Sequence, residues 1–276
     1  MALSGSAVSG LVGCPLRWFL ASEAAGQSPR TAASSLGSIV HALADEAVRG
    51  QCPPDAEAMM TRAADVWTGL RFEAPWIGER ERLEARAALQ RFVTWHTTRR
   101  GRRVVASEVP FRVEVPLGAD RAVVSGAIDR IELDPSGGVV VVDLKTGKTL
   151  SAVQQLPEHP QLGIYQLAVA KGAVDAYAGA GVRPAGAELV QLRHDARGLP
   201  KVQRQEAPPA DESTRAELQL AQAVATIRAE HFPARPSAGC RTCDFTALCP
   251  AQQSPAAQAP AQQAPSRSAP TAAGLR

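Results

Sequence analysis

The stretch GAIDRIELDPSGGVVVVDLKTG, residues 126–147, decides the fold that we expect of this chain. Two β-type runs flank DPSGG at 134–138, and this segment rich in Asp, Pro and Gly is typical of a hairpin turn. The run VVVVDL is apolar at successive positions, which is typical of a strand that is covered on both faces. The stretch therefore predicts a strand pair whose second strand lies at the centre of a sheet.

Helices and further strands are expected on both sides of this pair in the chain. Residues 6–100 have mostly helical patterns, and RRVVASEVPFRVEV predicts a strand before the pair. After the pair come a helix in HPQLGIYQLAVAKGA, strands in AELVQLRHD and PKVQRQEA, and a last helix at 211–231. This order predicts a mixed α/β core with an N-terminal helical layer.

The composition narrows the class of protein. The chain has 276 residues, is 45% hydrophobic and carries a net charge of only +3, which permits nucleic-acid binding without arguing for it. It has no apolar run of transmembrane length, and Arg17 and Trp18 interrupt the apolar N-terminal stretch, so we expect neither a membrane span nor a signal peptide. Five cysteines, an odd number, fit a reduced, cytoplasmic compartment. Residues 251–276 are rich in Ala, Gln and Pro, which predicts a disordered tail.

Two acids and a lysine give the central stretch its chemistry. Alternate residues of a strand share a face, so Asp143 and Lys145 point the same way. The preceding strand offers Asp129, on the face of four apolar residues: Val123, Ala127, Ile131 and Leu133. Two carboxylates and one ammonium suit a hard divalent cation with a group that activates water. Lys145 could instead only neutralise Asp143, but the combination with Asp129 favours the catalytic interpretation.

Three further groups have suggestive spacing, and each has an ordinary structural explanation beside the functional one. His41 follows Gly37 by four residues, on one helical face, where it is either a metal ligand or a surface histidine. Gln161 and Tyr165 are also four apart and either reach a phosphate backbone or form a polar helix face. Four arginines before the first strand either bind phosphate or form a solvated helix end: Arg99, Arg100, Arg102 and Arg103.

Thiols near the C-terminus indicate a second site. Cys240, Cys243 and Cys249 fall within ten residues, a density typical of a metal site. A closed tetrahedral site needs a fourth ligand, and no further cysteine follows them.

Together these pieces resemble the RecB-type branch of the PD-(D/E)XK nuclease superfamily over most of residues 10–250. The motifs run in the family's order: SGLVGCPLRWFL, GSIVHALAD, GAIDRIEL with VVVVDLKTGK, QLGIYQLA and C-x2-C-x5-C. The same arrangement occurs in the nuclease domains of AddB-like and AdnB-like recombination proteins and in CRISPR-adaptation nucleases. The resemblance implies a restriction-endonuclease-like mixed sheet flanked by helices, within one nuclease domain at 1–250. Its parts would be a helical layer at 6–100, a catalytic core at 101–232 and a cysteine segment at 240–249.

The resemblance also implies roles for single residues. His41, Asp129 and Asp143 would hold Mg²⁺ or Mn²⁺, with help from the Leu144 carbonyl. Lys145 would position or activate the attacking water, and Gln161 and Tyr165 would support the site and the DNA strand. Glu108 occupies the place of an acidic residue often found on the first core strand.

By the same resemblance Cys14 is the missing fourth ligand of the C-terminal thiols. The four cysteines would hold a [4Fe–4S] cluster that joins the two ends of the domain, with Zn²⁺ as the alternative occupant. Cys52 lies outside the pattern.

The implied activity is metal-dependent hydrolysis of phosphodiester bonds in DNA, as an exonuclease acting on single strands or duplex ends during repair or recombination. The alternative is a catalytically inactive Fe–S module that binds DNA or serves as a scaffold for a helicase. The sequence lacks the G-x-x-x-x-G-K-[ST] phosphate loop of an ATP motor, so a helicase would be a separate partner. No small-molecule ligand is expected.

Overall fold

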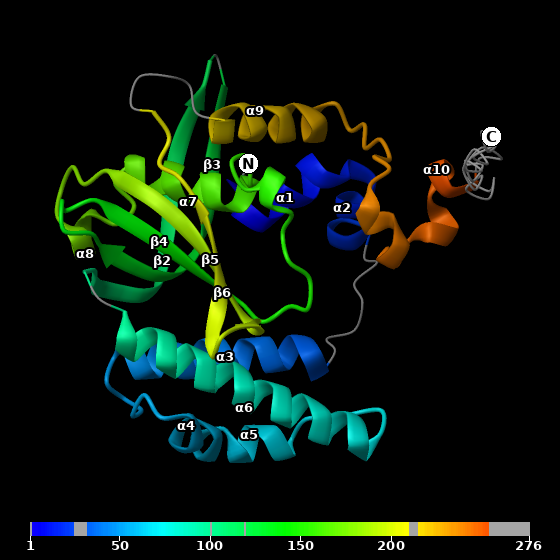
Figure 1. The fold of residues 1–276 in the computed structure, drawn as a ribbon. Helices are drawn as coiled ribbons and strands as arrows, with labels where there is room; N and C mark the ends of the chain where they lie inside the picture. Colours follow the sequence, from blue (N-terminus) through cyan, green and yellow to red (C-terminus); the bar gives the residue numbers. More distant parts are fainter. Residues whose placement is uncertain (1, 25–31, 100, 119, 210–214, 254–276) are drawn as a thin grey trace, which may run out of the picture.

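The computed structural model describes residues 2–24, 32–99, 101–118, 120–209 and 215–253, and from residue 36 onward also the side chains of the first long helix. A mixed six-stranded sheet forms the centre and helices cover both of its faces (Figure 1). This is the mixed sheet flanked by helices that the sequence predicts, and it is consistent with a restriction-endonuclease-like fold.

Strand β4 (Val139–Lys145) lies between β3 (Asp120–Leu133), to which it is antiparallel, and β5 (Pro184–Ala196), to which it is parallel. Every residue of β4 except Lys145 is buried, so the prediction of a central strand covered on both faces is confirmed. The remaining strands complete the sheet: β2 (Arg103–Leu117) antiparallel to β3, β6 (Leu199–Gln205) antiparallel to β5, and the short β1 (Ala2–Leu3) parallel to β3.

The DPSGG turn joins β3 to β4 as predicted. Asp134 Oδ1 accepts hydrogen bonds from the Ser136 backbone N–H at 2.8 Å and the Gly138 backbone N–H at 2.9 Å. Gly137 has a φ of +83°, a left-handed conformation that glycine adopts without steric cost. The turn fixes the register of the pair and thereby brings Asp129 and Asp143 to neighbouring positions.

Alternate residues of β4 enter two separate hydrophobic cores. Val139 and Val141 belong to the core under α1 (Gly5–Gly13), α7 (Pro160–Ala170) and α9 (Arg215–Arg228). Val142 and Leu144 belong to the other core, which is covered by three helices: α3 (Ala32–Val48), α4 (Ala56–Arg62) and α6 (Pro75–Thr98).

The predicted helical layer at 6–100 is therefore wrong in one respect. The segment is helical, but its first helices cover one face of the sheet and α3 to α6 cover the other, as Figure 1 shows. An apolar stripe makes a helix amphipathic without saying which face of the sheet it covers. The expected core at 101–232 accordingly shares its sheet with β1, which comes from the N-terminal end.

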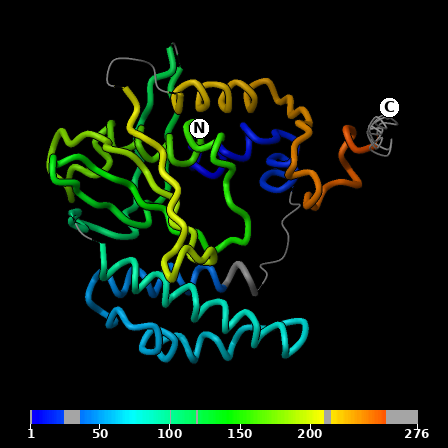
Figure 2. Tube along the Cα trace, in the orientation of Figure 1, coloured from blue at the N-terminus to red at the C-terminus, as the bar shows by residue number. Residues whose placement is uncertain are grey.

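Segments near the two ends of the described chain lie side by side, as the blue and orange parts of Figure 2 show. Phe19 of α2 (Pro15–Ser22) stacks on Phe232 with ring centroids 4.7 Å apart, and the Leu16 backbone N–H donates to the Pro233 carbonyl at 3.3 Å. The last described residues form short elements: the 3-10 helices Ala238–Thr242 and Thr246–Leu248, then α10 (Pro250–Gln253). Residues 251–253, which were expected in the disordered tail, are thus helical, and the rest of the predicted tail, 254–276, lies outside the described residues.

Arg99 and Arg102 neither form a solvated helix end nor have their charges free for phosphate. Arg99 Nε lies 2.8 Å from Glu132 Oε2, and Arg102 Nη1 lies 2.8 Å from Glu188 Oε1. Arg99 also stacks over the Trp95 ring at 4.7 Å. Both glutamates are buried, so they need these cations as partners, and the arginines are structural. Arg100 lies outside the described residues.

Three short helical elements complete the fold: α5 (Ala64–Thr68), α8 (Asp175–Ala178) and the 3-10 helix Val153–Gln155. Of the helices that the structure describes, none has both the length and the apolar composition needed to cross a bilayer.

Candidate active site

The site forms where β3 and β4 move apart. The two strands are paired as far as Arg130 and Val142, and the next positions along each strand are Asp129 and Asp143. Here the Leu144 backbone N–H turns to the side chain of Asp129 and donates to Oδ2 at 2.7 Å. The carboxylates are thereby held side by side at the end of the pairing.

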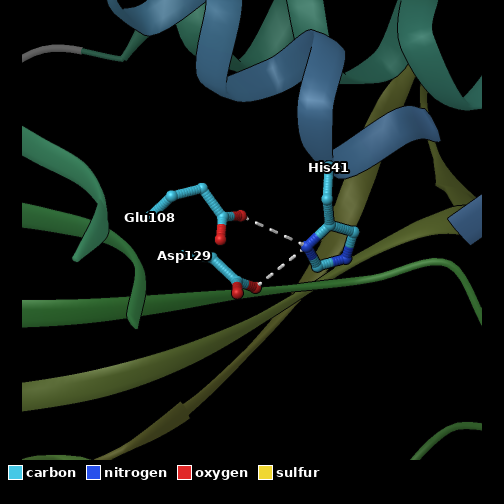
Figure 3. A group of neighbouring side chains, drawn as sticks. All are labelled: His41, Glu108 and Asp129. Atoms are coloured by element: carbon cyan, nitrogen blue, oxygen red, sulfur yellow. Dashed lines mark ion pairs between the residues drawn. The ribbon is translucent and has the colours of Figure 1, made fainter. Parts of the chain in front are cut away.

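A histidine and two acids converge beside this point (Figure 3). His41 Nδ1, on α3, lies 3.5 Å from Asp129 Oδ2 and 3.8 Å from Glu108 Oε1 on β2. Among the described residues this is the one group of three metal-binding side chains whose ligand atoms all lie within 4.8 Å of one another. An imidazole with two carboxylates is a donor set that suits Mn²⁺ and similar divalent cations.

The three side chains remain accessible. His41 keeps 28% of its side chain exposed. The site opens into a cleft of about 560 Å³, lined by Gly37, Ser38, His41, Ala42, Asp45 and Glu108. A cation or a phosphate group can therefore reach the converging ligands.

The acids also set the protonation of His41. Burial on its own would lower the pKa of His41, but the hydrogen bonds and charges of Asp129 and Glu108 outweigh it and raise this pKa to about 10. When no metal is bound, the His41 imidazolium therefore supplies the positive charge between the two carboxylates.

Glu108 is held in a strained backbone conformation. Its φ is +46°, in the left-handed region that residues other than glycine rarely adopt within a strand. Such a conformation costs on the order of 1–3 kcal/mol and is concentrated at functional sites. In this conformation the Glu108 carboxylate lies beside His41.

A second group of side chains surrounds Asp143. Lys145 Nζ lies 2.7 Å from Asp143 Oδ2 and donates to Gln161 Oε1 at 2.9 Å. The other end of the Gln161 amide, Nε2, is 3.1 Å from Asp143 Oδ1 and 3.0 Å from the Tyr165 hydroxyl. The structure therefore connects Asp143, Lys145, Gln161 and Tyr165 directly, rather than leaving the two helix residues on a solvated polar face.

Burial and charge perturb this second group. The Asp143 side chain is only 3% exposed, and its burial together with the nearby Asp129 charge raises the pKa of Asp143 above its usual range despite Lys145. Burial and the same carboxylates hold the pKa of Tyr165 above its usual range, so its hydroxyl stays protonated. Lys145 and His41 thus only partly offset the burial of Asp143 and the charge of Asp129 beside it.

His159 belongs to this neighbourhood but was not singled out in the sequence. It is the N-cap of α7, where its Nδ1 accepts from the Leu162 backbone N–H at 3.4 Å. Burial and the Lys145 charge lower the pKa of His159 to about 4, so the ring is neutral and can accept this bond. The His-Pro pair at the start of the helix was the available signal, because proline favours the first helical position.

Gly37 has a packing role one helical turn before His41. A Cβ at Gly37 would lie 2.8 Å from Thr146 Oγ1, in the segment that follows Lys145. The absent side chain lets this segment pass close to α3.

The expected surroundings of Asp129 are partly different. Ile131 is buried as predicted, but Val123 is only partly buried and Ala127 is exposed. Up to Ile128 the buried residues of β3 lie on one face, whereas three successive residues from Arg130 to Glu132 are buried. The change occurs where β4 begins to pair with β3.

The four cysteines that the sequence grouped line one cavity of about 300 Å³ between the two ends of the chain. None of them forms a disulfide. Two of the sulfurs accept backbone hydrogen bonds: Cys14 Sγ from Arg235 N–H at 3.4 Å, and Cys240 Sγ from Ser237 N–H at 3.3 Å. Cys52 is remote from them and is buried in the core of α3, α4 and α6.

Comparison with known proteins gives one family. Residues 2–250 match the sequence model of the PD-(D/E)XK nuclease superfamily. No curated protein matches the chain. Among solved structures, the crystal structure of SSO0001 is similar, with 14% sequence identity and a TM-score of 0.45 over 92% of this chain and 87% of that chain.

Proposed function

Because the chain belongs to the PD-(D/E)XK nuclease superfamily, we propose that it is a RecB-type, Mg²⁺- or Mn²⁺-dependent deoxyribonuclease. The observation that carries the proposal is the convergence of His41, Glu108 and Asp129 beside the Asp143–Lys145 pair. An open donor set for a hard cation would thus lie next to a half-buried ammonium group. Both are needed for phosphodiester hydrolysis, which must activate water and offset charge on the phosphate.

His41, Asp129 and Asp143 would hold the cation, and Glu108 would assist through the strained conformation that directs it to His41. A bound divalent cation would polarise the scissile phosphate and lower the pKa of a water molecule. Its charge would also relieve the repulsion between Asp129 and Asp143, which the raised pKa of Asp143 reflects.

Lys145 is the residue that would act on the attacking water and on the phosphate. Asp143 and Gln161 fix its ammonium group from two directions, so its position does not depend on the substrate. Tyr165 holds the amide of Gln161 from the other side and, being protonated, adds no negative charge where phosphate must bind. Hydrolysis would leave 5′-phosphate and 3′-hydroxyl ends.

For the cysteine cavity we propose a [4Fe–4S] cluster that joins the two ends of the domain. A single zinc ion with Zn–S bonds of about 2.3 Å draws four sulfurs close together. No three of these described sulfurs lie within 4.8 Å of one another. A cluster that gives each thiolate a different iron suits this wider spacing better. Such thiolates also suit a reducing compartment, the cytoplasm.

The biological setting follows by analogy. We propose exonucleolytic action on single strands or duplex ends in repair or recombination, alone or with a helicase partner.

The test is cleavage of end-labelled and circular DNA, single-stranded and duplex, by protein purified without oxygen. With Mn²⁺ the labelled linear substrates should be degraded to products bearing 5′-phosphates, and EDTA should stop the reaction. If DNA is bound but never cut with Mg²⁺ or Mn²⁺, the protein is the inactive DNA-binding module instead. Degradation of circles would contradict the exonuclease assignment.

A further inference from the structure

Three cations surround one buried carboxylate near the segment that follows Lys145. Glu81 of α6 is buried and contacts Arg193 of β5, Lys148 Nζ at 3.4 Å and Arg80 Nη2 at 3.9 Å. One carboxylate cannot neutralise three cations. Arg193 is nearly buried and is the structural partner of Glu81, which leaves Arg80 and Lys148 as the surplus charge.

The two surplus cations face solvent. The Lys148 side chain is 68% exposed and that of Arg80 is 56% exposed. Ion pairs at such exposure add little to stability, so a purely structural role explains Glu81 and Arg193 but not these two residues. Their remaining N–H donors are available to an anion.

An exposed tryptophan lies beside them. Trp76 is 64% exposed and is one helical turn before Arg80, whose guanidinium lies 5.5 Å from the Trp76 ring centroid. Large exposed aromatic rings next to basic side chains are typical of sites that stack nucleobases. The arginine contacts the ring and leaves further aromatic surface open to solvent.

This patch is directly connected to the proposed catalytic residues. Lys148 follows Lys145 by three residues, which limits the separation of their Cα atoms to about 11 Å. The intervening Thr146 packs against Gly37 of α3, one turn from His41, so the segment runs from the metal ligands to α6. A separation of about 11 Å amounts to only a few nucleotides along a DNA strand.

We propose that Trp76, Arg80 and Lys148 bind a single DNA strand next to the cleavage site. Lys148 and Arg80 contact backbone phosphates, while a base stacks on Trp76. Because no hydrogen-bond readout of base edges is involved, binding is tolerant of sequence. This inference rests on the proposed nuclease function, since it assigns the substrate path of the same site.

The experiment measures binding and chemistry separately with the full chain. Fluorescence anisotropy of labelled oligothymidylate in EDTA gives strand affinity without cleavage. Trp76→Ala should weaken binding by about tenfold, within the range for loss of one base stack, and Trp76→Phe should restore most of it. Lys148→Ala should lower the slope of log affinity against log salt by about 0.7. The matched controls are Leu83→Ala, an exposed apolar residue of α6, and Arg121→Ala, an exposed arginine of the β2–β3 ribbon.

Hydrolysis of bis(p-nitrophenyl) phosphate with Mn²⁺ reports on the metal site without a strand, and it should be unchanged in Trp76→Ala. If the wild type fails in this assay, the nuclease proposal is wrong while the binding result still stands. If Trp76→Ala and Lys148→Ala bind oligothymidylate like the wild type, the strand-binding inference is wrong. Equal weakening of a circular duplex without ends and of the single strand would also overturn it, because a base inside a duplex is covered on both faces and cannot stack on Trp76.

Discussion

Gln161 donates its side-chain Nε2–H to Asp143 Oδ1 at 3.1 Å, from helix α7 to the central strand β4. The same amide accepts from Lys145 through Oε1, so one residue orients both partners of the β4 ion pair. The amide is itself held by the Tyr165 hydroxyl. The position of the Lys145 ammonium is therefore determined by the packing of α7 on the sheet.

Replacing Gln161 should impair catalysis more than metal binding. Gln161→Ala removes the group that orients Lys145 and one hydrogen bond to Asp143, but it leaves the converging side chains of His41, Glu108 and Asp129 unchanged. We expect the single-turnover cleavage rate to fall by about 10- to 100-fold, as is typical when a supporting hydrogen bond is lost. Mn²⁺ affinity, measured by calorimetry, should change far less. Gln154→Ala, an exposed glutamine outside the site, is the control; equal losses in both variants would refute the assignment.

Metal affinity should increase with pH above neutrality. Asp129 and Glu108 raise the pKa of His41 to about 10 against the effect of burial, so the imidazole is protonated at pH 7 and must release this proton to coordinate. Between pH 7 and 9 the apparent Mn²⁺ affinity should rise by up to about tenfold per pH unit, with one proton released. Calorimetry in buffers of different ionisation enthalpy counts that proton.

His41→Ala should bind Mn²⁺ more weakly and lose this pH dependence. The exposed His231 offers the control, since His231→Ala should keep the wild-type slope. A wild-type affinity that stays constant from pH 7 to 9 would show that His41 does not coordinate.

The contact between Gly37 and Thr146 should be sensitive to a single methyl group. In Gly37→Ala the new Cβ would lie 2.8 Å from Thr146 Oγ1, and the overpacking should cost about 1–3 kcal/mol and displace the segment after Lys145. We expect a lower melting temperature and slower cleavage. Thr146→Ala removes the clashing oxygen, so the double variant should recover both properties. No recovery would mean that Gly37 acts through some other contact.

Loss of one proposed cysteine ligand should prevent binding of the proposed [4Fe–4S] cluster and destabilise the domain. Cys14→Ala, purified without oxygen, should lose its iron and its broad visible absorption, and it should melt at a lower temperature because ligand binding and folding are coupled. Cys52→Ala should keep the iron and lose only about 1 kcal/mol from the α3–α6 core. A colourless wild-type protein with stoichiometric zinc would contradict the iron–sulfur proposal.

The central strand was predictable because its information is local. Four successive valines followed by Asp-Leu-Lys allow few arrangements other than a doubly covered strand with its polar residues at one end. The DPSGG turn likewise contains its own hydrogen-bonding side chain, Asp134. These two features were sufficient to place Asp129 next to Asp143.

The contact between His41 and Glu108 and the arginine pairs depend on distant packing, so local patterns do not predict them; only the family resemblance pointed to His41 and Glu108. His41 meets Glu108 only because α3 packs on β2 and because the Glu108 backbone is strained, and neither fact has a sequence signal. Arg99 and Arg102 resemble a basic surface cluster until the buried Glu132 and Glu188 are placed beneath them. Helical periodicity did not indicate that α1 and α3 cover opposite faces.

The most direct test of the nuclease assignment is single-turnover cleavage of labelled single-stranded DNA with Mn²⁺ by wild-type protein, Asp143→Ala and the exposed-site control Asp65→Ala. We predict that wild type and Asp65→Ala cut at the same rate. Asp143→Ala should lose activity by at least about 1,000-fold, since it removes a proposed metal ligand and the partner of Lys145 together. Equal cleavage by Asp143→Ala and the wild type would contradict the account.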